Sequence, residues 1–357
     1  MAQQHLDPTD PTAGAVTGEA LAGYLRAQAT EFLRALRLHR ETGGTAGGAE
    51  GSVDAVRALR RSARRISGSL HTFRPLLDTG WSEEIRPELA WLSGTLGLEH
   101  AYEARLERLL LALHRLSGST TVPAQAVGAA VGGGGTGRAA PAPPKAAAPN
   151  GNLTVGAAKA GALLDRQLTL ARTRAHSTGL QALGSARFHA VADKVALLAS
   201  EVPLTPAART TDPRPLAAAA EERLTAAIAA LPLVTAGHPY NAEALVHGLS
   251  PDPSPHPQDG PWHQVRLLLR LHRYAREVLL GPEVPVDLRL LTAGQALDRH
   301  RDASEAAAAA AQAARTPRIA PATAYALGVL HADQRHEVEA ARFAFQQCWQ
   351  KRTVTTP

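Results

Sequence analysis

The stretch VRALRRSARRISGSLHTF, from Val56 to Phe73, carries the strongest local pattern in the sequence. Its apolar residues recur at alternating intervals of three and four, the pattern of a helix that packs along one seam. Arginines follow the same interval beside the seam, and no acidic residue lies between Ala55 and Leu77. The ridge consists of Arg57, Arg60, Arg61 and Arg64, and Arg65 flanks it. Because like charges one turn apart repel each other, such a ridge invites an external anion.

A second stretch, WHQVRLLLRLHRYAREVL from Trp262 to Leu279, repeats this pattern. Its ridge consists of His263, Arg266, Arg270 and Arg273, with no acidic residue before Glu277. Charged helix faces are usually only solvated surfaces, but such surfaces mix both signs, as residues 83–108 do here. Two matched helices without interspersed acids therefore favour a binding face for a phosphate-rich ligand, because guanidinium binds phosphate oxygens in pairs.

The rest of the chain predicts an all-α protein with four helices, a linker and four more helices. Alanine and leucine are abundant and aromatic residues make up only 4% of the sequence, which favours helix over sheet. We interpret this order as a duplicated four-helix unit. The expected helices begin near Thr17 and cover residues 17–40, 53–77, 82–116, 157–200 with a break near Gly184, 216–231, 262–280, 286–314 and 320–350.

The remaining segments are expected to lie outside any core. They are a disordered lead (1–16), a Gly/Ala/Pro-rich insert (118–152), a proline-rich linker (203–215) and a tail (353–357). The insert contains GGGGTG, but it lacks the GK[ST] ending of a phosphate loop and follows no strand. We therefore expect a dispensable surface loop there.

Composition narrows the classes of function. The net charge of +6 suits an acidic partner, and 34 of the 38 basic residues are arginines, although a GC-rich genome gives the same bias. The single cysteine, Cys348, excludes an intramolecular disulfide and a cysteine-rich zinc site. No secretory signal and no run of eighteen apolar residues is visible, so we expect a cytoplasmic protein.

Catalytic and metal-binding patterns are missing from the sequence. No GxSxG motif occurs, and the fifteen histidines are scattered without the paired spacing of zinc enzymes. A phospho-accepting role for His263 is less favoured than packing beside a basic ridge. We therefore expect a protein that is not an enzyme and has neither a cofactor nor a metal site.

Both ridge-bearing helices resemble the CHAD domain, the conserved histidine α-helical domain. The segments TFRPLLDTGW, WLSGTLGLEHAYEARLERL, ALDRHRDA and AYALGVLHADQRHEVEAARFAF extend this resemblance over about residues 17–352. The resemblance implies two antiparallel four-helix bundles, related by a pseudo-twofold axis, in residues 17–202 and 216–352. It also implies that a basic groove between them binds inorganic polyphosphate. The expected contact residues are Arg57, Arg60, Arg61, Arg64, Arg65, Arg74, His263, Arg266, Arg270 and Arg273.

The sequence departs from the family pattern at several positions. Arg57 stands where the family has its first histidine, and Asp302 keeps an acidic position whose counterpart in the first half is Ala101. Ser67, Leu267 and Leu271 occupy positions that are usually basic in the family.

Two alternative functions remain open. One is a nucleic-acid-binding helical protein, and the other is a structural adaptor at polyphosphate or polyester granules with weakened ligand binding.

Overall fold

The computed structural model describes residues 18–42, 49–118, 151–238, 249, 256–281 and 287–350. Over these ranges the chain is α-helical, with short 3₁₀ turns and one isolated bridge between Leu77 and Leu204 but no strand. The prediction of an all-α fold is confirmed. The proposed lead and tail and nearly all of the insert lie outside the described ranges.

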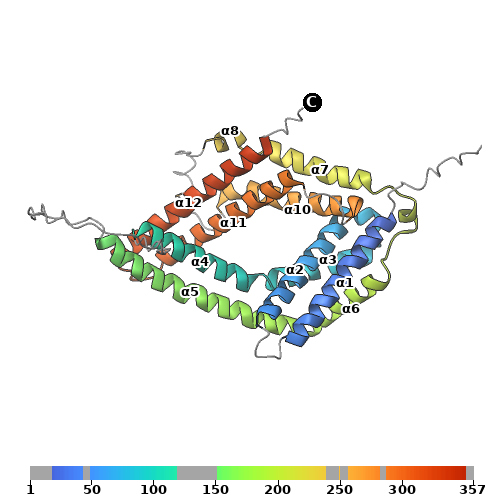
Figure 1. Ribbon diagram of the computed structural model, residues 1–357, viewed down its shortest axis with the longest axis horizontal. Helices are drawn as coiled ribbons and strands as arrows, with labels where there is room; N and C mark the ends of the chain where they lie inside the picture. The colour runs from blue at the N-terminus through green and yellow to red at the C-terminus, as the bar shows by residue number, and fades with distance from the viewer. Residues whose placement is uncertain are drawn as a thin grey trace, which may run out of the picture.

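The first group of helices surrounds the largest apolar core (Figure 1). It comprises α1 (Gly18–Thr42), α2 (Ala49–Thr72), α3 (Thr79–Thr95) and α6 (Ala186–Ser200). Helix α2 buries the seam expected from its sequence, including Leu59, Ile66 and Leu70, so that its arginines lie beside the core. It ends at Thr72 rather than at the expected residue 77, and a 3₁₀ turn that contains Pro75 follows.

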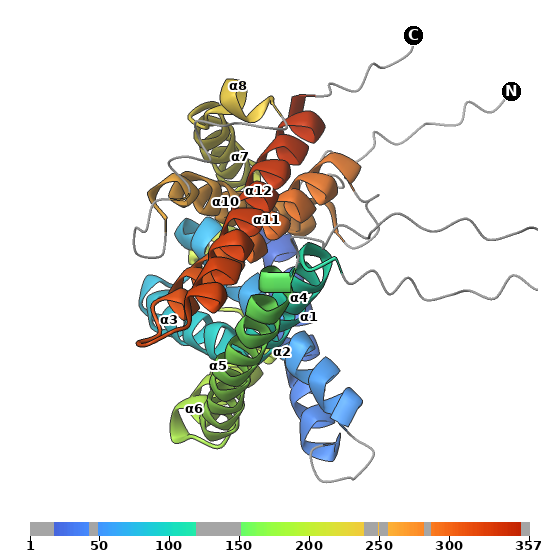
Figure 2. The ribbon, with the colours of Figure 1, turned by 90° about the vertical axis from the view of Figure 1, so that its left-hand side faces the viewer.

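The second group of helices packs around Trp262 and Phe345. It comprises α7 (Arg214–Ala229), the short α8 (Leu233–Ala236), α10 (Gly260–Leu280), α11 (Leu288–Ala314) and α12 (Pro321–Gln350). Asp287 caps α11 by accepting a hydrogen bond from the backbone N–H of Leu290. Helices α11 and α12 lie side by side over most of their length (Figure 2).

Two further helices, α4 (Leu98–Leu116) and α5 (Gly151–Leu183), pack on each other and on α11 and α12. Their contact forms a third apolar core, in which buried alanines of α11, among them Ala306 and Ala310, allow close approach. The expected single helix over 82–116 is therefore wrong, because the chain leaves the helical path at Leu96 and Gly97 and enters another core. The expected break near Gly184 is present between α5 and α6.

Together the three cores join the helices into a closed frame (Figure 1). Helices α2, α10 and α11 border its middle (Figure 1). None of the described helices is long and apolar enough to cross a membrane.

Candidate functional site

The site begins where α2 crosses α10. A Cβ atom added to Gly68 of α2 would lie 2.7 Å from the ring of Tyr274 and 3.2 Å from the side chain of Leu271. Gly68 therefore lets the two helices approach closely at this point. The crossing places the ridges found in the sequence on neighbouring surfaces.

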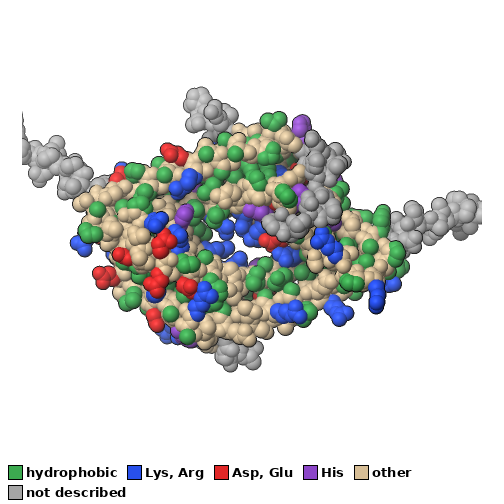
Figure 3. Space-filling view, turned by 180° about the vertical axis from the view of Figure 1, so that it is seen from behind, with side chains coloured by type: hydrophobic (Ala, Val, Ile, Leu, Met, Phe, Trp, Pro, Cys, Tyr) green, Lys and Arg blue, Asp and Glu red, His purple; other side chains and the backbone are tan. Residues whose placement is uncertain are grey.

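Six basic side chains from three helices form what we call the cationic cluster. Arg60 and Arg64 come from α2, and Arg301 comes from α11. These side chains lie close to α10. The charges of Arg64, Arg301 and Arg266 therefore each lower the pKa of Arg60. Lysine and arginine side chains gather in a hollow at the middle of the molecule (Figure 3). The cluster consists of Arg60, Arg64, His263, Arg266, Arg270 and Arg301.

Arg64 and Arg270 are the least satisfied members of the cluster. In the described part of the chain, neither guanidinium has a hydrogen bond or ion pair, and both Nε atoms are buried without an acceptor. Burial, followed by the neighbouring charges of Arg266 and Arg64, lowers the pKa of Arg270 to about 10. Burial likewise lowers the pKa of Arg64. Both side chains therefore need an external acceptor, preferably an anion.

Arg60 is held against the break between α3 and α4. Its Nε donates to the carbonyl oxygen of Ser93 at 3.1 Å. A Cβ atom at Gly97 would lie 2.5 Å from the Arg60 guanidinium carbon, so only glycine leaves room for this side chain as placed. Burial, followed by the charges of Arg64 and Arg301, lowers the pKa of Arg60 to about 10.

Acidic residues neutralise only part of the cluster. The Arg266 Nε donates to Asp298 Oδ1 at 2.6 Å, and Arg301 pairs with Asp302. A third carboxylate, Glu305, accepts a hydrogen bond from Arg105 of α4. Because Arg64 and Arg270 remain unpaired among the described residues, the hollow keeps an excess of positive charge.

The histidine of the cluster adjoins a second histidine. The rings of His263 and His300 lie 5.4 Å apart at an angle of 73°, and His300 is 1% exposed. Burial lowers the pKa of His263, and the charges of Arg266 and Arg301 lower it further, against the opposing effect of Asp259. Both rings are therefore neutral near pH 7, and an anion beside His263 would favour its protonation.

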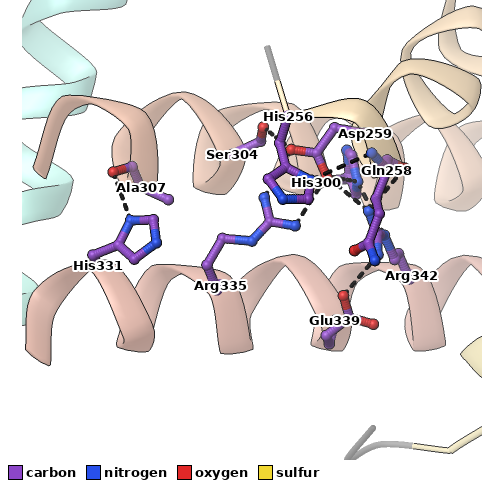
Figure 4. A network of polar contacts seen from close by, with 10 residues as sticks. All are labelled: His256, Gln258, Asp259, His300, Ser304, Ala307, His331, Arg335, Glu339 and Arg342. Atoms are coloured by element: carbon purple, nitrogen blue, oxygen red, sulfur yellow. Dashed lines mark hydrogen bonds and ion pairs between the residues drawn. The ribbon is translucent and has the colours of Figure 1, made fainter. Parts of the chain in front are cut away.

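Behind the histidines lies a buried polar network centred on Asp259 (Figure 4). The carboxylate of Asp259 is fully buried and accepts from Arg335 at 2.8 Å and from Arg342 at 2.7 Å. Ser304 donates to the same carboxylate, and Arg342 also donates to Glu339 at 2.7 Å. These bonds fix the segment before α10 to α11 and α12, and thereby fix the start of the helix that carries His263 and Arg266.

The structure brings together five of the ten residues predicted from the sequence: Arg60, Arg64, His263, Arg266 and Arg270. Arg57 and Arg61 are exposed on α2, and Arg57 pairs with Asp54. Arg74 pairs with Glu83. Arg65 and Arg273 instead line another cavity, of about 870 Å³, between α1 and α10.

Sequence reasoning missed Arg301, Arg105 and the network around Asp259. The predicted ridges were those without acidic residues between their arginines. Arg301 has Asp298, Asp302 and Glu305 nearby in the sequence. Arg105 lies between Glu103 and Glu107. Asp259 lies in a proline-rich segment whose sequence predicts a loop. Although aspartate is a common N-cap and Asp259 directly precedes α10, its side chain makes no cap hydrogen bond, so the N-cap preference was no signal for the network. In the described ranges, no group of three or more candidate ligands could hold a metal ion.

Comparison with known proteins identifies the family of the chain. A family model described as CHAD domain matches residues 27–283. The structure of PptA from Streptomyces chartreusis is 70% identical in sequence, with a TM-score of 0.76 over 94% of this chain and 100% of that one. The CHAD domain from the plant Ricinus communis is 16% identical, with a TM-score of 0.46 over 92% of both chains. No curated protein matches the chain. The family match covers well over half of the sequence, and the chain belongs to the CHAD domain family.

Proposed function

We propose that this protein binds inorganic polyphosphate, without catalysis, across the cationic cluster. The observation that carries the proposal is the pair Arg64 and Arg270, which come from different helices and have buried donors without acceptors in the described chain. The CHAD family is known for polyphosphate binding. A chain of linked phosphates supplies many oxygens in a row, which is what several guanidinium groups at one place require.

The spacing of the ridges supports a linear ligand. Arg60 and Arg64 stand about one helical turn apart on α2, as do Arg266 and Arg270 on α10, and one turn advances about 5.4 Å along the axis. An isolated phosphate could reach one member of each pair, whereas a chain could run past both. The partial pairing of Arg266 with Asp298 would hold the guanidinium in place while leaving donors for the ligand.

We further propose that the fold is a duplication. Residues 17–202 and 216–352 would be two antiparallel four-helix units related by a pseudo-twofold axis, with residues 203–215 as the linker; in the first unit α3 with α4, and α5 with α6, would each count as one interrupted helix. The support is that α2 and α10 carry matching ridges and cross each other. Each unit would then contribute one wall of the groove, and granules of polyphosphate would be a natural partner.

Departures from the family pattern fall mostly at the edge of the cluster. Arg57 is exposed, and Leu267 is 44% exposed on α10. Leu271 is buried in the second core, and Ser67 donates to the carbonyl oxygen of Arg86. These positions thus lie on the rim or in the packing, and we expect Arg60, Arg64, Arg266 and Arg270 to provide most of the affinity.

Titration of the full chain with long-chain polyphosphate tests the proposal. The double variant Arg64→Gln/Arg270→Gln removes the two unpaired guanidiniums. At roughly 1.5–3 kcal/mol for each charge-assisted contact, discounted for screening in an open hollow, affinity should fall by about 100-fold. Arg166→Gln/Arg174→Gln removes two exposed arginines of α5 and is the matched control.

Single- and double-stranded DNA of equal charge should be titrated in parallel. Tighter binding of either nucleic acid than of polyphosphate would favour the nucleic-acid alternative. Unchanged polyphosphate affinity in the double variant would place the site elsewhere. No measurable binding of any of the three ligands by the wild-type protein would leave only the adaptor role.

A further inference from the structure

A separate cavity of about 450 Å³ lies beside the cationic cluster. It is bounded by α4, α11, α12 and the segment at His256. One wall is the alanine run of α11, where Ala307, Ala308 and Ala311 leave space that longer side chains would fill. Its volume is in the range of pockets that hold small molecules. The run of alanines thus has a consequence beyond helix formation, because it keeps the cavity open.

Two guanidiniums lining this cavity have donors without acceptors. Arg335 is 3% exposed, and its two terminal nitrogens donate to Asp259 at 2.8 and 3.2 Å. The side chain of Arg105 is 17% exposed, and its Nη2 donates to Glu305. The Nε atom of each is buried and has no partner in the described chain. Because Arg105 is bonded among the described residues only through Nη2, its partly exposed guanidinium keeps N–H donors for an oxyanion, and the held guanidinium of Arg335 adds positive charge to the wall.

The surroundings suit an anion rather than a cation. His331 and Arg315 also line the cavity, and His331 Nδ1 donates to the carbonyl oxygen of Ala307 at 3.0 Å (Figure 4). That bond leaves Nε2 as the ring nitrogen able to meet a ligand. The two carboxylates of the lining are already engaged, since Asp259 accepts from Arg335 and Arg342, and Glu305 pairs with Arg105 and Arg301.

We infer that this cavity is a second binding site, separable from the cationic cluster, which takes a single small oxyanion of the phosphate class. The occupant has two possible sources. It is either free orthophosphate or the terminal phosphate of a chain whose interior lies on the cluster, and only the second source rests on the proposed function. In both cases the anion accepts hydrogen bonds from the remaining N–H donors of the Arg105 guanidinium, and Arg335 adds positive charge to the wall of the cavity.

Filling the cavity without changing its charge is the direct test. The full-length wild-type protein and the variant Ala308→Leu are titrated with inorganic orthophosphate. Wild type should bind saturably, and Ala308→Leu should weaken binding by at least about tenfold, because the added side chain occupies the space of the ligand. Ala340→Leu adds the same volume on an exposed position of α12 and should leave binding unchanged. Arg105→Lys keeps the charge that pairs with Glu305 but removes the remaining guanidinium donors, so it should also weaken binding.

The source of the phosphate is resolved with short polyphosphates. Chains with free ends and chains with both ends esterified are compared on wild type and on Ala308→Leu. If the terminal phosphate occupies the cavity, free ends should bind tighter than blocked ends in wild type, and Ala308→Leu should abolish the difference.

The variant Arg64→Gln/Arg270→Gln separates this inference from the proposed function. Orthophosphate binding should persist in it even where long-chain binding is lost. The inference is overturned if wild type neither binds orthophosphate saturably nor distinguishes free from blocked ends. It is equally overturned if Ala308→Leu and Arg105→Lys both behave as wild type.

Discussion

Arg64 and Arg270 show how a single residue can connect folding to binding. A buried donor without an acceptor costs about 1–3 kcal/mol, and more when the group is charged. Neither side chain finds a partner among the described residues, although both are packed into the frame between α2, α10 and α11. A bound polyanion would remove this cost, so affinity and stability should be coupled through the same two side chains.

His263 gives this coupling a pH dependence. Burial lowers its pKa below the usual value of about 6.5, so the ring is neutral in the free protein near pH 7. A polyanion stabilises the protonated ring and raises its pKa, which means that binding takes up a proton. Polyphosphate affinity should therefore rise severalfold as pH falls from about 8 to 5.5. Titrations at several pH values measure this rise.

The rise in affinity should be smaller in His263→Gln and unaltered in His189→Gln, which changes an exposed histidine of α6. Equal pH dependence in all three proteins would contradict the assignment.

Asp259 differs from Arg64 and Arg270, because it pairs with buried charges instead of remaining unpaired. Its carboxylate is fully buried between Arg335 and Arg342. Burial acts to raise its pKa, but the hydrogen bond and charge of Arg335 hold the pKa far below the usual range. Asp259→Asn leaves these buried cations underpaired and should reduce the free energy of unfolding by about 3–5 kcal/mol. Denaturant titration measures the loss. Asp298→Asn, at a half-exposed ion pair with Arg266, should cost less than about 1 kcal/mol. Similar losses for the two variants would show that the network around Asp259 stabilises the fold no more than a half-exposed ion pair does.

At the scale of elements, most helices could be predicted because their apolar seams are local patterns. The seam of the expected helix over 82–116 continues through Leu89, Leu92, Leu109 and Leu113, yet the first two enter the first core and the last two enter the third. Periodicity shows which face is buried but not against which partner, so the break at Gly97 could not be predicted. The same limit hid Arg301, whose neighbouring acids mask it in the sequence while the fold turns it toward α2 and α10.

The crossing of α2 and α10 should be sensitive to size at one position. Gly68→Leu would push against Tyr274 and Leu271, and overpacking of this kind costs about 1–3 kcal/mol. Thermal unfolding should occur several degrees lower, and polyphosphate affinity should fall because the two ridges move apart. Gly94→Leu is the matched control, since a Cβ atom there meets nothing within 4 Å. If affinity persists in Gly68→Leu despite the lower melting temperature, the ridges do not act as one site.

At the scale of the whole molecule, the cationic cluster draws on helices from widely separated parts of the sequence. Arg60 belongs to α2, Arg270 to α10 and Arg301 to α11, and the α4–α5 pair closes the frame against α11 and α12. A ligand that contacts several of these elements binds only the assembled frame. It should therefore stabilise the whole fold rather than one helix.

Polyphosphate should consequently raise the melting temperature, and the rise should depend on salt. At a ligand concentration 100 times Kd the stabilisation is about 2.7 kcal/mol, which corresponds to roughly 3–5 °C for a chain of this size. Because each phosphate contact releases bound counterions, as on nucleic acid, the shift should shrink steeply as salt increases. Differential scanning fluorimetry at several salt concentrations measures it. Arg64→Gln/Arg270→Gln should unfold at or above the wild-type temperature without ligand, because buried unsatisfied charges are gone, and should show little ligand-induced shift. A full shift in that variant, or one independent of salt, would mean that the stabilising contacts lie outside the cationic cluster.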